Sequence, residues 1–516
     1  MPGPRELHTS RPGIGSSPVG VDGWGGGDER SLAEVRYGLG MANGAAFFDL
    51  DRTLLAGASG PAISTALREV GLLSDRHIPG EDLVFRVFNL VGENRPSMML
   101  TRQAVRMSQG WDADRARAAG TLAATTLIDQ VQPYAKLLIA QHQAEGRPVV
   151  IATTTPDHLV RPLAEALGVD DVIATRYEEA SGTFTGRFDG DFVWGKGKYL
   201  AVKAWCSDRG VSMGESWAYS DSYYDVPLLS AVGHPVVVNP DPRMRVQAIA
   251  RRWPTVYLDV PPGVPKLGGL EVQQVAMPFA RPELLLYAKL DIAGTENIPL
   301  DGPAIICGNH RSYFDPLAVG YALAQRGRPC RFLGKKEVFD APVIGDLVRA
   351  AGGIRVDRGT GSDQPLEEAA QALRAGELVA MMPQGTIPRG KAFFDPVLHG
   401  RWGAAKLAAM TGAPVIPLGL WGTEKVWPRN ARMPNVLNVV SPPKVTVRLG
   451  APVAIGGVDP DADTAAIMAA ITSLLPPEAR EFRQPTREDL VRTIPSSYKG
   501  DPEDYEHESS RRPGTD

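Results

Sequence analysis

The chain has 516 residues, which is too long for one ordinary hydrophobic core and predicts two or three domains. Hydrophobic residues make up 43% and charged residues 22%, and the formal net charge of -4 shows no basic excess that would favour nucleic-acid binding. The three cysteines, Cys206, Cys307 and Cys330, lie far apart without a C-x-x-C pair, so neither zinc nor a disulfide framework is expected and a cytoplasmic setting fits best.

Both ends of the chain are predicted to be tails. Residues 1–42 are rich in Gly, Pro, Ser and Arg, lack the apolar stretch of a secretory signal and are expected to be disordered. Residues 481–516 are assigned to a C-terminal tail, whose end "YKGDPEDYEHESSRRPGTD" has the same disordered composition. No window reaches the roughly 18 consecutive apolar residues of a membrane-spanning helix. Any membrane contact is therefore expected to be peripheral, at the inner face of the membrane.

The first α/β pattern covers residues 43–252. The apolar run "GAAFFDLD" predicts a strand that ends in carboxylates, and residues 57–146 then show apolar residues at helical spacing. Strand patterns return at "PVVIATTT", "DVIATRYE", "SWAYSD" and "PVVVN". Strands that alternate with helices indicate a parallel sheet with helices on its faces.

A second α/β pattern covers residues 285–480. The proline-containing segment 253–284 precedes it and is predicted to be a linker with a helix inside it. Strands are expected at "AIICGNH", "CRFLGKK", "GGIRV", "LVAMMPQG" and "PVIPLGL".

Paired carboxylates follow the first predicted strand. Asp49 and Asp51, in "DLDRTLL", can face one pocket beyond the strand end, where they could hold a divalent cation or one could attack a phosphoryl group. A turn with solvated acids explains the same pattern when it stands alone.

Polar residues that suit phosphate chemistry follow later strands in order. Thr153 could bond phosphate oxygens, Lys198 or the nearby Lys196 could neutralise phosphate charge, and Asp221 and Asp225 follow another strand. A helix N-cap for Thr153, surface charge for Lys198 and an ordinary loop acid for Asp221 are the simpler alternatives.

With these motifs, residues 45–250 resemble the haloacid dehalogenase superfamily of phosphohydrolases, in particular the phosphoserine-phosphatase-like subclass. The resemblance implies a Rossmann-like fold in which residues 57–146 form a helical cap. It implies that Asp49 is the phosphoryl acceptor and Asp51 the general acid/base. It also implies that Thr153 and Lys198 bind the phosphate. The implied Mg²⁺ ligands are Asp49, Asp51, Asp221 and Asp225.

A histidine and an aspartate lie five residues apart after the run "PAIICG". Acyl transfer needs a base that takes the proton of an attacking hydroxyl, and histidine, here His310, is the side chain best suited to that task near neutral pH. Asp315 could fix the imidazole tautomer, as in a serine-hydrolase triad whose hydroxyl belongs to the acceptor. A chance pairing is the alternative for an isolated H-x-x-x-x-D.

Three further blocks fit acyl transfer to a phosphate-bearing acceptor. "GGIRVDR" supplies Arg358 for a bidentate phosphate contact, "MMPQGTIPRG" forms a tight loop with Gly385 and Thr386, and residues 414–417 form an apolar strand suited to an acyl slot. Each block alone could belong to a core or a turn, and Arg358 alone could form a surface ion pair.

Together these blocks make residues 285–455 similar to the glycerolipid acyltransferase family, which includes lysophosphatidic acid acyltransferases. The resemblance implies catalysis by H-x-x-x-x-D and acceptor-phosphate binding by G-x-I-x-x-x-R. The family usually has Glu-Gly-Thr-Arg where this chain has Gln-Gly-Thr-Ile at residues 384–387. The negative charge of Glu is therefore lost at Gln384, and the positive charge of Arg is lost at Ile387. Arg389 is a candidate substitute for the cation, and a related lipid hydroxyl or a different head group is an alternative acceptor.

The local composition of residues 326–345 suggests a segment that could contact a membrane. A basic stretch precedes the apolar segment "VFDAPVIG", and it comprises Arg326, Arg328, Arg331, Lys335 and Lys336. Basic residues beside apolar ones suit an anionic bilayer, and a solvated face beside a core helix is the alternative.

The predicted protein is a fusion of two catalytic domains, and it resembles bifunctional proteins that carry both activities. The expected reaction moves a fatty acyl group from acyl-CoA or acyl carrier protein to a lysophospholipid, preferably 1-acylglycerol 3-phosphate, giving phosphatidic acid. Two alternatives remain. One is a phosphomonoester phosphatase whose C-terminal half only binds lipid, and the other is a lipid-binding scaffold without activity.

Overall fold

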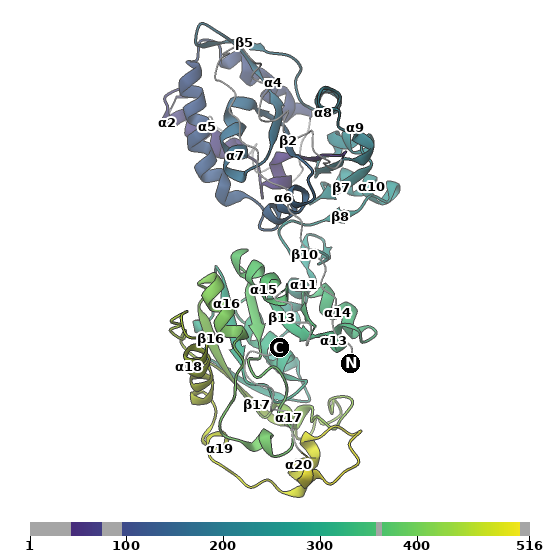
Figure 1. The fold of residues 1–516 in the computed structure, drawn as a ribbon, viewed down its shortest axis with the longest axis vertical. Coiled ribbons are helices and arrows are strands. Elements are labelled where there is room, and N and C mark those ends of the chain that lie inside the picture. Colours follow the sequence, from purple (N-terminus) through teal and green to yellow (C-terminus); the bar gives the residue numbers. More distant parts are fainter. Residues whose placement is uncertain (1–42, 75–94, 358–363, 506–516) are drawn as a thin grey trace, which may run out of the picture. The chain divides into compact units, whose positions relative to one another are not determined.

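The computed structural model describes residues 43–74, 95–357 and 364–505. They form two α/β parts, residues 43–256 and 266–505, which are described separately (Figure 1). The expected N-terminal tail, part of the expected cap and Arg358 lie outside the described residues. The α/β class predicted for each half of the chain is confirmed.

The first part is built on a sheet of six parallel strands in the order β3-β2-β1-β6-β7-β8. Their bounds are β1 (Ala46–Phe48), β2 (Val149–Pro156), β3 (Asp171–Thr175), β6 (Trp217–Ser220), β7 (His234–Val238) and β8 (Thr255–Val256). Because β8 pairs with β7, the sheet extends into the segment that the sequence analysis assigned to a linker. Leu258 and Val260 are also buried there.

Helices cover both faces of this sheet because successive strand residues point to opposite sides. Phe48 packs into a core with α2 (Gly60–Glu69), α5 (Ala113–Leu127), α6 (Ala135–Ala144) and α7 (Asp157–Leu167). Phe47 packs into a second core with α8 (Lys196–Arg209), α9 (Val226–Leu229) and α10 (Pro242–Arg251). The helix α4 (Arg95–Met107) and a hairpin of β4 (Tyr177–Ala180) and β5 (Thr183–Phe188) complete the part.

The second part is built on a sheet of seven strands in the order β11-β17-β16-β12-β15-β13-β14. All neighbours are parallel except β16 and β17. The bounds are β11 (Lys289–Ala293), β12 (Ala304–Gly308), β13 (Cys330–Lys335), β14 (Ile354–Val356), β15 (Leu378–Met381), β16 (Val415–Trp421) and β17 (Lys444–Leu449). The central strand β12 is fully buried, which explains its unbroken apolar sequence.

Helices also cover both faces of the second sheet. The core on one face contains α12 (Asp315–Ala324), and the core on the other contains α15 (Gln364–Arg374), α16 (Gly403–Thr411) and α18 (Pro460–Ser473). The shorter elements are β9 (Lys266–Leu267), β10 (Leu270–Glu271), α11 (Val272–Ala276), α13 (Lys336–Phe339), α14 (Ile344–Ala350), α17 (Thr423–Val426) and α19 (Pro477–Arg480). Among the described helices, none is long and apolar enough to cross a membrane.

The expected tail from residue 481 is wrong for its first half. Residues 487–493 form α20 (Arg487–Thr493), which begins with a capping box at Thr486. Leu490 and Ile494 are buried, and the Gly390 amide donates to Thr493 Oγ1 at 3.0 Å. These few buried contacts hold the segment against the second part, whereas residues 506–516 lie outside the description.

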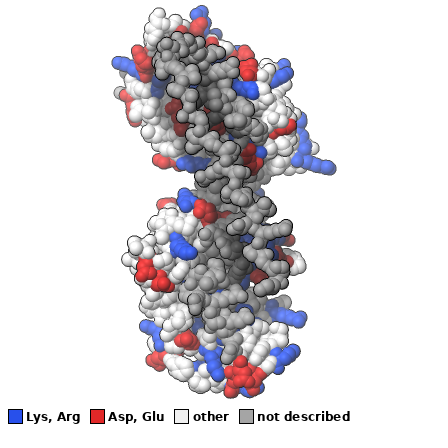
Figure 2. Space-filling view, in the orientation of Figure 1, with Lys and Arg blue, Asp and Glu red and all other residues white. Residues whose placement is uncertain are grey.

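Charged side chains are mixed on the visible surface. On the face that Figure 2 shows, acidic and basic side chains of the described residues are interspersed. This mixture agrees with a net charge of only -4 over 516 residues.

Candidate active sites

The strand order of the first sheet brings the predicted carboxylates together. The strand β1 pairs in parallel with β2 on one side and with β6 on the other. Asp49 follows β1, Thr153 lies near the end of β2 and Asp221 follows β6. Since the carboxyl ends of parallel strands meet at one edge, the three residues lie at the same edge of the sheet.

Lys198 lies at the centre of this site. Its side chain is completely buried, and its Nζ donates to Asp49 Oδ1 at 2.8 Å and to Asp225 Oδ2 at 2.7 Å. A buried ammonium needs such partners because desolvation of an unpaired charge is costly. Lys196 is exposed, so the geometry favours Lys198 of the two lysines.

Asp225 is held from a second side by Ser220, whose hydroxyl donates to Asp225 Oδ2 at 2.7 Å. Its other oxygen, Oδ1, is buried and has no hydrogen-bond partner among the residues that the structure describes. Ser220 is a site residue that the sequence analysis missed. Its place directly before Asp221, at the end of a predicted strand, was the available signal.

Asp51 lies in the turn Leu50–Leu54 that follows β1. The Ser59 amide donates to Asp51 Oδ1 at 2.5 Å. Burial raises the pKa of Asp51 above its ordinary value, and the hydrogen bond from Ser59 opposes this only in part. A carboxyl with a raised pKa can hold a proton at higher pH, which suits a general acid.

The same turn reaches Asp221. Arg52 has a positive φ of 59°, and its Nε lies 3.2 Å from Asp221 Oδ2. The Asp221 amide donates to Thr53 Oγ1 at 3.0 Å. The D-x-D-x-T motif therefore connects two strand ends, and Arg52 is a second residue that the sequence analysis did not single out.

The carboxylates have the right donor chemistry for Mg²⁺, a hard cation that prefers oxygen. Within the described ranges, however, no three His, Cys, Asp or Glu side chains are grouped as a metal site. The ammonium of Lys198 and the guanidinium of Arg52 lie against Asp49 and Asp221. The buried Oδ1 of Asp225 is the observation that leaves room for a further positive partner.

Thr153 is not a helix N-cap. The N-cap of α7 is Pro156, and Thr153 is buried, with its Oγ1 accepting from the Thr155 amide at 3.1 Å. The hydroxyl groups of Thr155 and Ser59 lie 3.4 Å apart. The end of β2 therefore lies beside the segment that holds Asp51.

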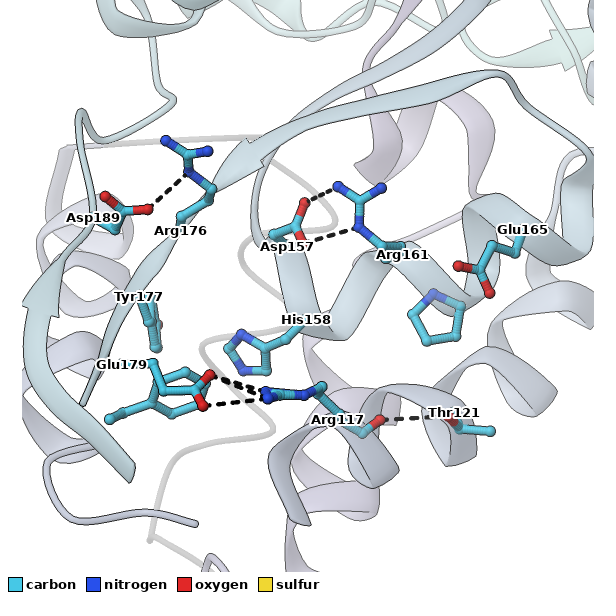
Figure 3. A pocket seen from close by; sticks show the side chains of 12 residues that line it. Arg117, Thr121, Asp157, His158, Arg161, Glu165, Arg176, Tyr177, Glu179 and Asp189 are labelled. Atoms are coloured by element: carbon cyan, nitrogen blue, oxygen red, sulfur yellow. Dashed lines mark hydrogen bonds and ion pairs between the residues drawn. The ribbon is translucent and has the colours of Figure 1, made fainter. Parts of the chain in front are cut away.

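A separate pocket opens between α5, α7 and the β4–β5 hairpin (Figure 3). Its charged side chains pair with one another, as Arg117 does with Glu179 and Asp157 with Arg161. Burial lowers the pKa of His158 in its wall to about 4. None of the residues proposed above for phosphate chemistry lines it, so we assign it no reaction.

In the second part, His310 follows β12 and Asp315 begins α12. His310 Nδ1 lies 2.7 Å from Asp315 Oδ2, and Asp315 is fully buried while 18% of the His310 side chain is exposed. With a proton on Nδ1 facing the carboxylate, Nε2 is the nitrogen that can accept a proton. The pair can therefore act as a base toward a hydroxyl that approaches from solvent.

Asp315 also organises the loop that carries the histidine. Its Oδ2 accepts from the Arg311 amide at 2.6 Å and from the Ser312 amide at 2.8 Å. Asn309 fixes the other end of the loop, because its side-chain amide exchanges two hydrogen bonds with the backbone of Leu420 in β16.

Gln384 supports the histidine directly. Its Oε1 accepts from the His310 backbone amide at 2.7 Å. A neutral amide is sufficient for this task, since a backbone N–H needs only an acceptor. Gln384 therefore supplies the acceptor for the backbone of the loop that carries His310.

Arg311 is a further residue that the sequence analysis missed. Its guanidinium lies 4.2 Å from the Phe393 ring centroid and 4.1 Å from that of Trp421, and it pairs with Glu424. Its position next to His310 was the only sequence signal, because its partners are distant in the chain.

The candidate phosphate-binding residues are only partly brought together. Gly385 has a positive φ of 69°, and Lys335 Nζ donates to Thr386 Oγ1 at 3.3 Å. Ile387 is buried, and Arg389 Nη1 donates to the Tyr505 hydroxyl at 3.0 Å. Arg358 cannot be placed because it lies outside the described residues.

The three arginines of the basic stretch form hydrogen bonds and ion pairs within the protein. Arg331 is buried between Glu271 and Glu377, at 2.6 and 2.5 Å. Arg326 and Arg328 donate to backbone carbonyl groups of residues 298–302 and 376. These three arginines satisfy internal acceptors, and a lipid surface would compete with those bonds.

Comparison with known proteins agrees with the two domains. The family model described as haloacid dehalogenase-like hydrolase matches residues 46–230, and the one described as Acyltransferase matches residues 289–421. A probable phosphatase of Mycobacterium tuberculosis is 36% identical over 225 residues, which cover 43% of this chain and 77% of that protein. A phosphoserine phosphatase of the same organism is 33% identical over 212 residues, or 40% and 69%.

Among solved structures, the second half is similar to the 1-acyl-sn-glycerophosphate (LPA) acyltransferase from Thermotoga maritima. The sequence identity is 23%, the match covers 39% of this chain and 77% of that chain, and the TM-score is 0.29.

Proposed function

We propose that this chain, which belongs to the haloacid dehalogenase-like hydrolases and carries an acyltransferase domain in its C-terminal half, is primarily a lysophospholipid acyltransferase. The acyl group comes from acyl-CoA or acyl carrier protein, and the preferred acceptor is 1-acylglycerol 3-phosphate. The pair of His310 and Asp315, joined at 2.7 Å, carries this proposal.

The proposed step uses this pair as a general base. His310 Nε2 takes the proton of the acceptor hydroxyl, and the hydroxyl oxygen attacks the carbonyl carbon of the acyl thioester. An ester bond forms, the carbon–sulfur bond breaks, and the imidazolium returns its proton to the leaving thiolate. Asp315 stays ionised and stabilises the imidazolium. Arg358, Gly385, Thr386 and Arg389 are the candidates for the acceptor phosphate.

The first experiment is acyl transfer from labelled acyl-CoA or acyl carrier protein to a panel of lysolipids, with lipid mass spectrometry of the products. His310→Ala should lower kcat/KM about 10²–10⁴-fold, the usual contribution of a general base. Phosphate release by the same variant is the internal control and should not change. Acyl transfer that survives His310→Ala at the full rate contradicts the proposal.

The N-terminal domain supports a second activity, hydrolysis of a phosphomonoester with Mg²⁺. The buried arrangement of Lys198, Asp49 and Asp225 is the specific observation in its favour. Asp49 is proposed as the phosphoryl acceptor and Asp51 as the acid/base, with Thr153 and Lys198 on the phosphate. Asp221 and Asp225, with Asp49 and Asp51, are the proposed metal ligands, and bound Mg²⁺ would neutralise phosphate charge there.

This second activity is tested by measuring phosphate release by the Asp49→Asn variant. Acyl transfer by the same variant is the control. Mg²⁺ binding is tested without turnover, because Mg²⁺ should raise the thermal unfolding midpoint of the chelator-treated protein but not that of Asp221→Asn. Loss of both activities with retained lipid binding would favour the scaffold alternative. Phosphatase activity alone would favour a C-terminal half that only binds lipid.

A further inference from the structure

The segment between α17 and β17 exposes an unusual number of apolar side chains. In the solvent-facing stretch of residues 433–440, Met433 is 69% exposed, Leu437 86% and Val440 95%, and Val436 and Val439 are also exposed. Single exposed apolar residues are common on protein surfaces, whereas a contiguous cluster marks a contact site. We call residues 432–440 the apolar loop.

The charged residues within the segment that carries the apolar loop have one sign. Residues 425–444 contain Lys425, Arg429, Arg432 and Lys444 and no Asp or Glu, in a chain whose net charge is -4. Lys444 pairs with Asp291, while Lys425 and Arg432 are exposed. Exposed apolar residues flanked by cations are the combination that suits an anionic bilayer.

The loop is shaped by its own hydrogen bonds. The Asn435 amide donates to the Val426 carbonyl at 3.2 Å, and Asn438 Nδ2 donates to the Ser441 carbonyl at 2.9 Å. Trp427 Nε1 donates to the Ala431 carbonyl at 3.2 Å. These three bonds satisfy polar groups of residues 426–441 within that segment itself.

The segment is also connected to the proposed catalytic motif. Ser312 Oγ donates to the Trp427 carbonyl at 2.7 Å, and the rings of Tyr313 and Trp427 lie 5.6 Å apart. The guanidinium of Arg429 lies 5.3 Å from the Tyr313 ring centroid. Ser312 and Tyr313 stand between His310 and Asp315, so a surface that holds the loop also positions the motif.

We propose that the apolar loop docks this protein on a lipid bilayer that contains anionic lipids. Leu437 and Val440 enter the boundary between head groups and acyl chains, and Arg432 and Lys425 meet anionic head groups. The inference rests on the proposed function, which requires a lipid acceptor at His310. Contact between two copies is disfavoured because a two-fold interface would bring the same cations together.

The experiment is flotation of the full chain with phosphatidylcholine vesicles, with and without phosphatidylglycerol. The wild-type protein should bind better with phosphatidylglycerol, and the preference should weaken with salt. Leu437→Asp combined with Val440→Asp should weaken binding about tenfold or more, since it places charge in the apolar boundary. The matched control is Val458→Asp, which changes a 91% exposed valine before α18.

Three further measurements separate the possible failures. Equal binding by the wild-type protein and the double variant overturns the proposal, as does an equal loss for Val458→Asp. If the double variant unfolds at a lower temperature, Arg432→Glu replaces it and must abolish the phosphatidylglycerol preference. The proposal is also overturned if the wild-type protein is a dimer, the double variant is a monomer, and both bind vesicles equally. Because His310→Ala should still bind vesicles, failure of the proposed catalysis is seen separately.

Discussion

The hydrogen bond between Gln384 and the loop that carries His310 can be tested with a single substitution. Gln384→Leu keeps the approximate size of the side chain and removes the oxygen that accepts from the His310 amide at 2.7 Å. A fully buried donor without an acceptor costs about 1–3 kcal/mol, and this range is the upper bound for the part-buried His310 amide. If this cost moves His310 away from its working position, kcat/KM for acyl transfer falls about 5- to 150-fold.

The assay is steady-state acyl transfer in which kcat and KM are separated. Because Gln384 positions the base and is not proposed to hold the acceptor, kcat should fall while KM stays nearly constant. Gln384→Glu restores an acceptor oxygen and should keep most of the activity. Gln325→Leu, an exposed change at the end of α12, is the matched control. A Gln384→Leu enzyme within about twofold of the wild type would refute the positioning role.

Three further variants test buried charges and a buried histidine. Lys198→Met should lower the free energy of unfolding of the first domain by about 3–5 kcal/mol in urea titrations, and addition of Asp225→Asn should recover part of it. Arg331→Met should destabilise the second domain by a similar amount, about 3–5 kcal/mol, since it leaves the carboxylates of Glu271 and Glu377 without their shared cation. An unchanged urea midpoint would contradict this. Burial, with Arg147 nearby, lowers the pKa of His142 from 6.5 to about 4, so neutral His142 stabilises the fold above pH 6.5 and this contribution is lost as the pH falls toward 4. His142→Gln should therefore show a shallower loss of thermal stability over that pH interval, and an identical pH profile would count against the assignment.

The sequence predicted the elements whose pattern is local. Alternation of apolar strands with amphipathic helices predicted both α/β parts. The resemblance to haloacid dehalogenases implied that Asp49 and Asp221 share a site, and the parallel pairing of β1 with β6 places both residues at one edge of the sheet. The spacing of His310 and Asp315 spans a loop and the first turn of a helix. Such a short loop leaves few ways for the two side chains to lie apart.

The sequence could not predict contacts that join distant segments. Arg331 reads as part of a basic surface because its partners, Glu271 and Glu377, are 60 and 46 residues away in the chain. The partner of Gln384 is likewise 74 residues away. The short helix α20 has too few residues to show a clear periodicity, so its polar composition favoured a tail.

The segment that ends at Tyr505 has a practical consequence for dividing this protein. The Tyr505 hydroxyl accepts from Arg389, and the Tyr505 carbonyl lies so close to Gly390 that a Cβ there would approach it to 3.1 Å. A fragment cut at residue 480, where the sequence alone would end the domain, loses both contacts. An independently folding C-terminal half should therefore be cut no earlier than residue 505.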